Sequence, residues 1–258
     1  MIKPRHQPIY SVPALEKGLD ILETLASAHV PQSLTQLGRR LDRTPSELFR
    51  MLAVLERRSY IVRDPVSEGY LLTLKLYELA HTHSPVDHLL KAALIPMREL
   101  AEEARESCHL CVLSGPMLLV IAQAESPEPV RLSVEVGDRV APLTTASGRV
   151  LSAFLPPDDR QRLLNAETSL SKTERAALAA ELAAIRRRGY LLAASTRRAG
   201  LDLSCVVGNP SAGVLAVLGV PFLPGSINDG RERKLIPVVQ AYAERITAAL
   251  GLSNSEKD

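Results

Sequence analysis

Apolar residues recur every three or four positions in three successive stretches near the start of the chain, as in amphipathic helices. The first stretch predicts a helix over residues 11–25 with the core-facing residues Leu15, Leu19, Leu22 and Ala26, widened by Ile21 and Leu25. The second, over residues 34–41, would bury Leu34, Leu37 and Leu41. The third, from residue 45 onward, would turn inward Leu48, Leu52 and Leu55, with Met51 beside them. The pattern therefore predicts three helices around one small core.

Signals for a helix start come directly before the third stretch. Thr44 can cap the helix, Pro45 suits its first turn, and Glu47 completes a T-x-x-E capping box. Residues 42–44 have about the right length for the corner of a helix-turn-helix. The second and third helices are therefore predicted to form that motif.

After Arg58 the periodicity changes from helical to extended. Residues 60–62 and 70–72 are apolar or aromatic, and they flank the breaker-rich segment 64–69, which contains Pro65 and Gly69. Two short strands around such a turn predict a β-hairpin, the wing of a winged helix-turn-helix.

The stretch from residue 33 to residue 63 is locally basic, because its arginines outnumber its acidic residues. Local basicity suits phosphate contacts, and small polar groups beside an arginine at the exposed start of a helix suit a DNA major groove. The candidate DNA-binding residues are Thr35, Arg43, Ser46, Glu47, Phe49, Arg50, Arg57 and Arg63. The alternative is an ordinary helical bundle whose arginine-rich face is only solvated.

Beyond the predicted wing the pattern continues with further helices and then mixes helices with strands. Helices are expected over residues 73–80, 86–105 (with a kink at Pro96), 145–154, 158–164, 172–188 and 231–250. Strands are expected over residues 108–113, 117–124, 130–136, 190–194, 203–207 and 214–220. This order predicts an α+β fold in which an antiparallel sheet flanked by helices encloses a ligand. The expected domains are a winged helix-turn-helix over residues 1–83 with a flexible N-terminal arm, and a ligand-binding domain over residues 84–258 that includes the connector helix.

Composition narrows the class of protein. In 258 residues, 46% are hydrophobic and the formal net charge is +2, so a nucleic-acid surface has to be a local patch. Aromatic residues make up only 3%, which argues against single-strand binding by stacking. The 3 cysteines, without a secretory signal, fit a reducing interior, and no apolar run reaches the roughly 18 residues of a membrane span. We expect a cytoplasmic protein that uses no cofactor and no membrane.

Several segments taken together resemble the IclR family of bacterial transcriptional regulators. In the first half the similar segments are VPALEKGLDILETLA, PSELFRMLAVLERRSYI, Tyr70–Leu72 and KLYELA. In the second half they are VGDRVAPLTTASGRVLSAFLP, IRRRGYLLAAS and LDLSCVVGNPSAGVLAVLGVPFL. The resemblance implies a winged helix, a GAF-like effector domain, and a homodimer or tetramer on double-stranded DNA with a palindromic operator. It also implies a small organic acid or an aromatic metabolite as effector.

The chain departs from the family pattern at several positions. Gly38 stands where alanine is usual, at a cost of roughly 1 kcal/mol in helix propensity. Asp42 and Ser59 stand where glycine is common. Gly219 and Pro221 occupy positions where several members place serines that bind a carboxylate.

Polar residues in the second half suggest an effector site. At the start of an expected helix, free amides and hydroxyls would suit an anion at Thr144, Thr145, Ala146, Ser147 and Gly148. Asp202 and Ser204 alternate along an apolar strand and so share one face, and the resemblance adds Gly219 to the candidates. Ordinary helix capping and solvent exposure at a strand end are the alternatives.

Other chemistry finds little support in the sequence. The segment from Cys108 to Cys111 contains His109 but lacks a second ligand pair, and residues three apart on a strand face opposite sides, so we expect no metal. Residues 147–148 lack the G-x-S-x-G elbow, and the H-E-x-x-H and phosphate-loop motifs are absent. We therefore expect a regulator and no enzyme. The alternatives are an interaction module without a ligand and, as a weaker option, a small-molecule hydrolase.

Overall fold

The structure is a computed structural model that describes residues 12–81, 85–196, 199–223 and 230–252. The expected N-terminal arm lies outside these residues. The chain forms two compact units, Met1–Ser84 and Pro85–Asp258. Each unit has its own hydrophobic core and is described by itself.

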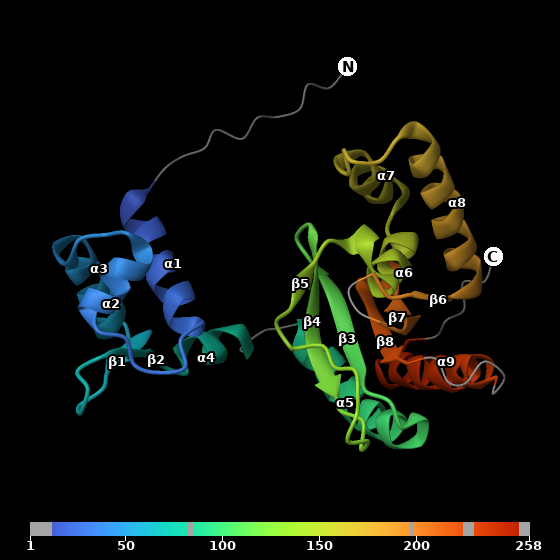
Figure 1. Ribbon diagram of the computed structural model, residues 1–258, viewed down its shortest axis with the longest axis horizontal. Coiled ribbons are helices and arrows are strands. Elements are labelled where there is room, and N and C mark those ends of the chain that lie inside the picture. The colour runs from blue at the N-terminus through green and yellow to red at the C-terminus, as the bar shows by residue number, and fades with distance from the viewer. Residues whose placement is uncertain (1–11, 82–84, 197–198, 224–229, 253–258) are drawn as a thin grey trace. The chain divides into compact units, whose positions relative to one another are not determined.

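The first unit is a winged helix-turn-helix (Figure 1). Its elements are α1 (Pro13–Ala26), α2 (Leu34–Leu41), α3 (Pro45–Arg57), β1 (Ile61–Arg63), β2 (Tyr70–Leu72) and α4 (Lys75–His81). Strands β1 and β2 pair antiparallel, with Val62 opposite Leu71. The core of this unit consists of Ile21, Leu25, Leu37, Leu48, Leu52, Ile61 and Tyr70.

The core face predicted for α1 is confirmed at Ile21, Leu22 and Leu25, which pack in or against the core, and is wrong at Leu15 and Leu19. Ile21 is fully buried, whereas Leu15 and Leu19 remain 59% and 49% exposed. The apolar surface of α1 is wider than the part that α2 and α3 cover, so Leu15 and Leu19 lie at the surface. There, leucines of α1 and α4 form the lining of an apolar groove of about 600 Å³, together with Met51 and Tyr60.

The corner of the helix-turn-helix depends on a close backbone approach. Asp42 adopts a left-handed conformation with φ 50°, and the amide of Arg43 donates to the carbonyl oxygen of Gly38 at 2.9 Å. A Cβ at residue 38 would lie 2.8 Å from the carbonyl oxygen of Arg43. Glycine at this position therefore permits the tight corner, which outweighs its low helix propensity.

The second unit contains a six-stranded antiparallel sheet in the order β5-β4-β3-β8-β7-β6. Its strands are β3 (Cys108–Ser114), β4 (Met117–Ala124), β5 (Arg139–Val140), β6 (Tyr190–Ala194), β7 (Leu201–Asn209) and β8 (Val214–Phe222). Its α-helices are α5 (Pro85–Ala104), α6 (Ala146–Phe154), α7 (Pro157–Ala166), α8 (Lys172–Arg188) and α9 (Arg231–Ala249). The 3₁₀ turns are η1 (Pro142–Thr144) and η2 (Pro210–Ala212). The predicted α+β architecture, a sheet flanked by helices, is confirmed.

Helices cover both faces of this sheet (Figure 1). Leu110, Leu218 and Cys205 pack on one face in a cluster with residues of α5 and α9. Cys111, Val217 and Leu191 pack on the opposite face in a second cluster with residues of α6 and α8. Every central strand therefore contributes side chains to two separate cores.

The prediction of a third strand in this unit is wrong, because residues 130–136 form a loop. Val134 is buried, but Val130 and Val136 are 80% and 59% exposed. Alternation decides which way side chains face, but a strand also needs a neighbouring backbone at hydrogen-bond distance. Here the backbone bonds to β4 begin only at Gly137 and Asp138, which exchange hydrogen bonds with Val120.

Helix propensity and packing make opposite predictions for Gly38→Ala. Propensity alone favours alanine by about 1 kcal/mol, whereas forcing a methyl group against fixed backbone typically costs about 1–3 kcal/mol. We expect the packing term to dominate, so that Gly38→Ala lowers the unfolding midpoint of the first unit in urea.

Gly18→Ala in the middle of α1 is the matched control. A Cβ at residue 18 meets no atom within 4 Å, so this variant should gain about 0.5–1 kcal/mol. A Gly38→Ala protein as stable as Gly18→Ala would show that the corner tolerates a side chain.

Candidate DNA-binding and effector sites

Helix α3 presents a polar, basic face to solvent. Leu48 and Leu52 are buried, which fixes the rotation of the helix and leaves Ser46, Arg50 and Arg57 exposed on the other side. Phe49 lies among them with 59% of its surface exposed. An aromatic ring and a guanidinium that are both exposed near the start of one helix are suited to contacts in a major groove.

Glu47 has structural contacts within the first unit. Its Oε2 accepts hydrogen bonds from the amide and the hydroxyl of Thr44 at 3.0 and 2.9 Å, and its Oε1 accepts one from Nζ of Lys17 at 2.9 Å. These contacts, with the Lys17 bond as the largest cause, lower the pKa of Glu47 to about 2. Glu47 therefore joins the start of α3 to α1.

The other predicted DNA-binding residues lie around α3 at the surface of the first unit. Thr35 in α2 and Arg43 in the corner are both exposed. Arg63 at the end of β1 is held within the wing: its Nε donates to the carbonyl oxygen of Glu68 at 3.0 Å, and its guanidinium lies 6.0 Å from the ring centre of Tyr70. This orders the guanidinium at the base of the wing turn.

The loop before α6 contains the first group of predicted effector residues. Thr145 is the N-cap of α6, and its hydroxyl accepts a hydrogen bond from the amide of Gly148 at 3.1 Å. The hydroxyl of Thr144 donates to the carbonyl oxygen of Ala141 at 2.7 Å, and Ala146 packs in the core beneath α6. A Cβ at Gly148 would lie 1.9 Å from the carbonyl oxygen of Pro142, so this glycine lets η1 approach the helix.

Ser147 points from α6 into the sheet and meets a residue predicted independently. Its hydroxyl lies 3.0 Å from the hydroxyl of Ser204 on β7 and 3.3 Å from Nε2 of His109 on β3. The exposed fractions of Ser147, Ser204 and His109 are 5%, 0% and 8%. The structure thus brings two candidate segments into one buried polar cluster.

Gly219 and Asp202 lie next to this cluster. Gly219 on β8 is the ladder partner of both His109 and Ser204. A Cβ there would lie 2.4 Å from Nε2 of His109 and 2.8 Å from the hydroxyl oxygen of Ser147. Asp202 stands two residues before Ser204 on the same face of β7, opposite Pro221. Gly219 therefore provides the space that the imidazole ring occupies.

His109 was not among the predicted site residues. The sequence predicts no metal site in the segment from Cys108 to Cys111 and so assigns His109 no role. One signal could have identified it: His109 occupies a position on an otherwise apolar strand at which the alternation requires a buried side chain. A buried imidazole needs polar partners, which a lone strand cannot supply.

The cysteines behave as core residues. Cys108 packs toward α5, where its thiol donates to the carbonyl oxygen of Met97 at 3.3 Å, and Cys111 packs on the opposite face of the sheet. Burial raises the pKa of Cys108, Cys111 and Cys205 to about 12. Across the described residues, no group of three or more histidine, cysteine or acidic side chains could hold a metal ion.

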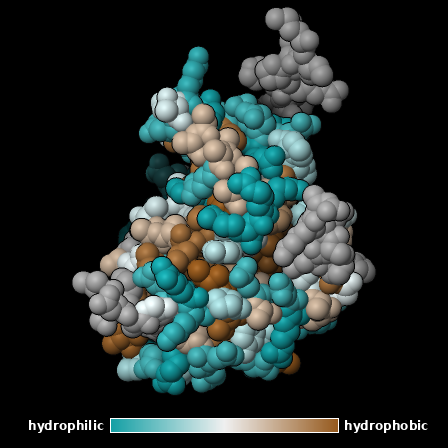
Figure 2. Space-filling view, turned by 90° about the vertical axis from the view of Figure 1, so that its right-hand side faces the viewer, coloured by the Kyte–Doolittle hydropathy of each residue, from teal (hydrophilic) through white to brown (hydrophobic). Residues whose placement is uncertain are grey.

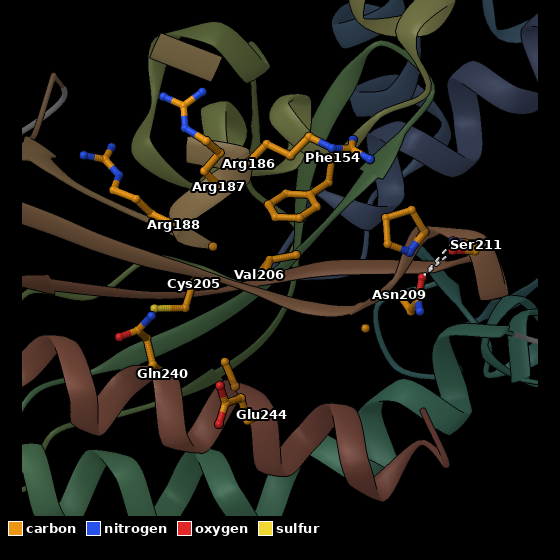
Figure 3. Close-up of a pocket in the computed structure, with 14 residues that line it drawn as sticks. Phe154, Arg186, Arg187, Arg188, Cys205, Val206, Asn209, Ser211, Gln240 and Glu244 are labelled. Carbon is orange, nitrogen blue, oxygen red and sulfur yellow. Dashed lines mark hydrogen bonds between the residues drawn. The ribbon is translucent and has the colours of Figure 1, made fainter. Parts of the chain in front are cut away.

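Another hollow, of about 170 Å³, lies at the C-terminal end of α8. Figure 2 shows that hydrophobic residues are exposed among hydrophilic ones on the side of the second unit where α8 and α9 lie. In Figure 3, Arg186 lies along the ring of Phe154, whose centre is 5.7 Å from its Cζ, while Glu244 projects from α9. The lining of this hollow carries both arginines and a glutamate, and arginines in it already contact aromatic rings. It therefore does not indicate one class of ligand.

Models of two protein domains match this chain. The model described as "Bacterial transcriptional regulator IclR C-terminal" matches residues 82–248, and the model described as "IclR helix-turn-helix domain" matches residues 14–65. The two matches fall on the two compact units in turn. Of the described helices, none is long and apolar enough to cross a membrane.

Two curated transcriptional regulators are similar to this chain over most of their length. The transcriptional regulator KdgR of Escherichia coli is 29% identical, over 93% of this chain and 94% of its own length. The regulator BhcR of Paracoccus denitrificans is 30% identical, over 73% of this chain and 69% of its own length. The crystal structure of an IclR homologue from Microbacterium hydrocarbonoxydans, complexed with 4-hydroxybenzoate, has a TM-score of 0.77 at 23% identity and covers 92% of this chain and 99% of its own.

The lowered pKa of Glu47 predicts a pH-dependent contribution to the stability of the first unit. The pKa in the folded state, about 2, lies below the ordinary value of 4.5, so the ionised carboxylate stabilises the fold above pH 4.5 and this contribution is lost as the pH falls toward 2. The parent should therefore unfold at higher urea concentration than Glu47→Gln at pH 7, and the difference should shrink between pH 4.5 and pH 2.

Lys17→Met tests the cause of the shift. Removing the ammonium group should raise the pKa of Glu47, measured by NMR titration of its side-chain carboxyl, toward the ordinary value. An unchanged pKa in Lys17→Met would assign the shift to the Thr44 contacts alone.

Proposed function

The chain belongs to the IclR family of transcriptional regulators, and from that premise we propose which of its residues contact the operator and which contact the effector. It is a DNA-binding regulator with an N-terminal helix-turn-helix domain and a C-terminal effector-binding domain, and a small metabolite modulates its operator binding. We place the boundary between the domains at residues 83–84, as the sequence suggested.

We propose that α3 is the recognition helix. Ser46, Phe49 and Arg50 would contact base edges, because they lie on the exposed face near the helix start. Thr35, Arg43 and Arg57 would contact phosphates on either side, and Arg63 would contact the backbone from the wing. Glu47 would act by holding the start of α3 against Lys17, so that its effect on DNA binding is indirect.

We propose that the protein binds a palindromic operator as a homodimer or tetramer. One recognition helix covers only a few base pairs, so two helices related by a two-fold axis would read an inverted repeat. The exposed leucines of α1 and α4 support self-association, because monomeric proteins rarely leave such an apolar groove open to water.

The proposed effector site lies between α6 and the sheet. The observation that supports it is the hydrogen bond between Ser147 and Ser204, which joins residues from two segments that were selected separately. Thr144, Thr145, Ala146 and Gly148 would shape the entrance, and Asp202 and Gly219 would border the ligand. An organic acid or an aromatic metabolite fits this polar cluster in an apolar layer, and the 4-hydroxybenzoate complex of a family member supports that class.

We propose that the chain catalyses no reaction and acts in the cytoplasm. The curated relatives with similar sequences are transcriptional regulators.

Arg50→Ala tests the DNA-binding surface. An operator selected from random duplexes should contain an inverted repeat with half-sites about 34–36 Å apart or a multiple of that. On it, Arg50→Ala should lose about 1–3 kcal/mol of binding free energy if Arg50 contacts a base edge. Arg162→Ala on α7, where the side chain pairs with Asp159, is the control and should bind as the parent does. Equal affinity of Arg50→Ala and parent would remove Arg50 from the interface.

A ligand screen tests the effector class. Benzoate, 4-hydroxybenzoate, pyruvate and succinate are added to the full chain, and its melting temperature is measured. A ligand at 100 times its Kd stabilises the folded protein by about 2.7 kcal/mol. The acid that raises the melting temperature most should also change affinity for the selected operator. A chain that no acid stabilises would contradict the proposed effector class.

A further inference from the structure

A row of polar residues crosses the sheet beneath α6. Gln123 on β4 is the ladder partner of His109 on β3, His109 is the partner of Gly219 on β8, and Gly219 is the partner of Ser204 on β7. Ladder partners place their side chains on the same face of a sheet. The row therefore lies on the face that α6 and α8 cover, and Ser147 reaches it from α6.

The surroundings of this row are apolar. Cys111, Val217 and Leu191 on the same face are all buried among leucines, valines and alanines of the α6 layer. Polar groups in such a layer are costly unless they are hydrogen-bonded. The hydroxyls of Ser147 and Ser204 and the ring of His109 satisfy one another in part.

Gln123 lies at the end of the row, and its side-chain amide has a hydrogen-bond donor that no acceptor among the described residues satisfies. Its Nε2 is buried, and within the part of the chain that the structure describes no acceptor lies at hydrogen-bond distance. An amide nitrogen can only donate, so the group that would satisfy it must be an acceptor. A ligand oxygen is such an acceptor, and it would lie beside His109 because the two residues are cross-strand neighbours.

The missing side chain of Gly219 leaves room for the polar side chains of the row. With any side chain at this position, the imidazole of His109 and the hydroxyl of Ser147 could not keep their places. The absence of a side chain therefore lets His109, on a central strand, reach from β3 across β8 to Ser147.

We infer that His109 and Gln123 contact the effector and determine its specificity by donating hydrogen bonds to an oxygen-rich, acidic end of the ligand. This inference rests on the proposed effector site and adds two residues from β3 and β4 to it. When the ligand enters, its oxygens replace the hydroxyl of Ser204 as partners of Ser147, while Gln123 gains an acceptor.

Isosteric variants of Gln123 and His109 test the inference by calorimetry on the full chain. The probes are the four acids of the screen, each compared with its amide. Gln123→Glu keeps the shape but replaces the donor by a negative charge, so the Kd of the acid should rise about tenfold to a hundredfold while the Kd of the amide changes little. His109→Leu should weaken acid binding by a similar factor, and His109→Gln, which retains a donor, should restore part of it.

Ser152→Ala is the matched control. Ser152 is a fully buried serine on α6, but its hydroxyl donates to the carbonyl oxygen of Gly148, outside the row. It should bind the acid as the parent does, whereas Ser147→Ala should bind it more weakly.

The outcomes separate this inference from the proposed function. If Ser147→Ala weakens acid binding but Gln123→Glu and His109→Leu do not, the effector site stands and the inference is wrong. If Gln123→Glu weakens acid and amide alike, the effect is structural and the inference is also wrong. A parent that binds none of the acids overturns the proposed effector class and this inference together.

Discussion

The second unit is governed by the burial of its sheet on both faces. Because α5 and α9 cover one face and α6 and α8 the other, a central strand must supply apolar side chains to two cores. A polar side chain on such a strand costs free energy unless a partner from another element reaches it. Polar residues at these positions therefore indicate function more strongly than the same residues at the surface.

Ser204 and His109 are such residues, and α6 supplies the partner for both. Ser147 reaches the sheet because η1 packs closely beneath the start of α6, an approach that the missing side chain of Gly148 permits. The same few interactions that hold α6 on the sheet thus also close the polar cluster. A ligand that competes for these hydrogen bonds has a direct means of shifting α6, and differential binding to two arrangements is the physical basis of regulation.

In the first unit, the orientation of α3 depends on contacts at both sides of its start. Glu47 completes the cap with Thr44 and pairs with Lys17 of α1, and the corner before α3 closes on Gly38. Glu47, which the sequence suggested as a DNA contact, thus has contacts that position the helix. The exposed leucines of α1 mark a further surface that this unit alone does not bury.

The sequence by itself determined the local elements. Helical spacing, the capping box at the start of α3 and the breaker-rich turn predicted α2, α3 and the wing, because each signal lies within a few neighbouring residues. It also selected Ser147, Ser204 and Gly219, partly through resemblance. Tertiary structure alone decided which side of α1 is buried, that residues 130–136 form a loop, and that His109 meets Ser147. His109 and Ser147 are 38 residues apart and Ser147 and Ser204 are 57 apart, so only the ladder order of the sheet and the packing of α6 bring them together.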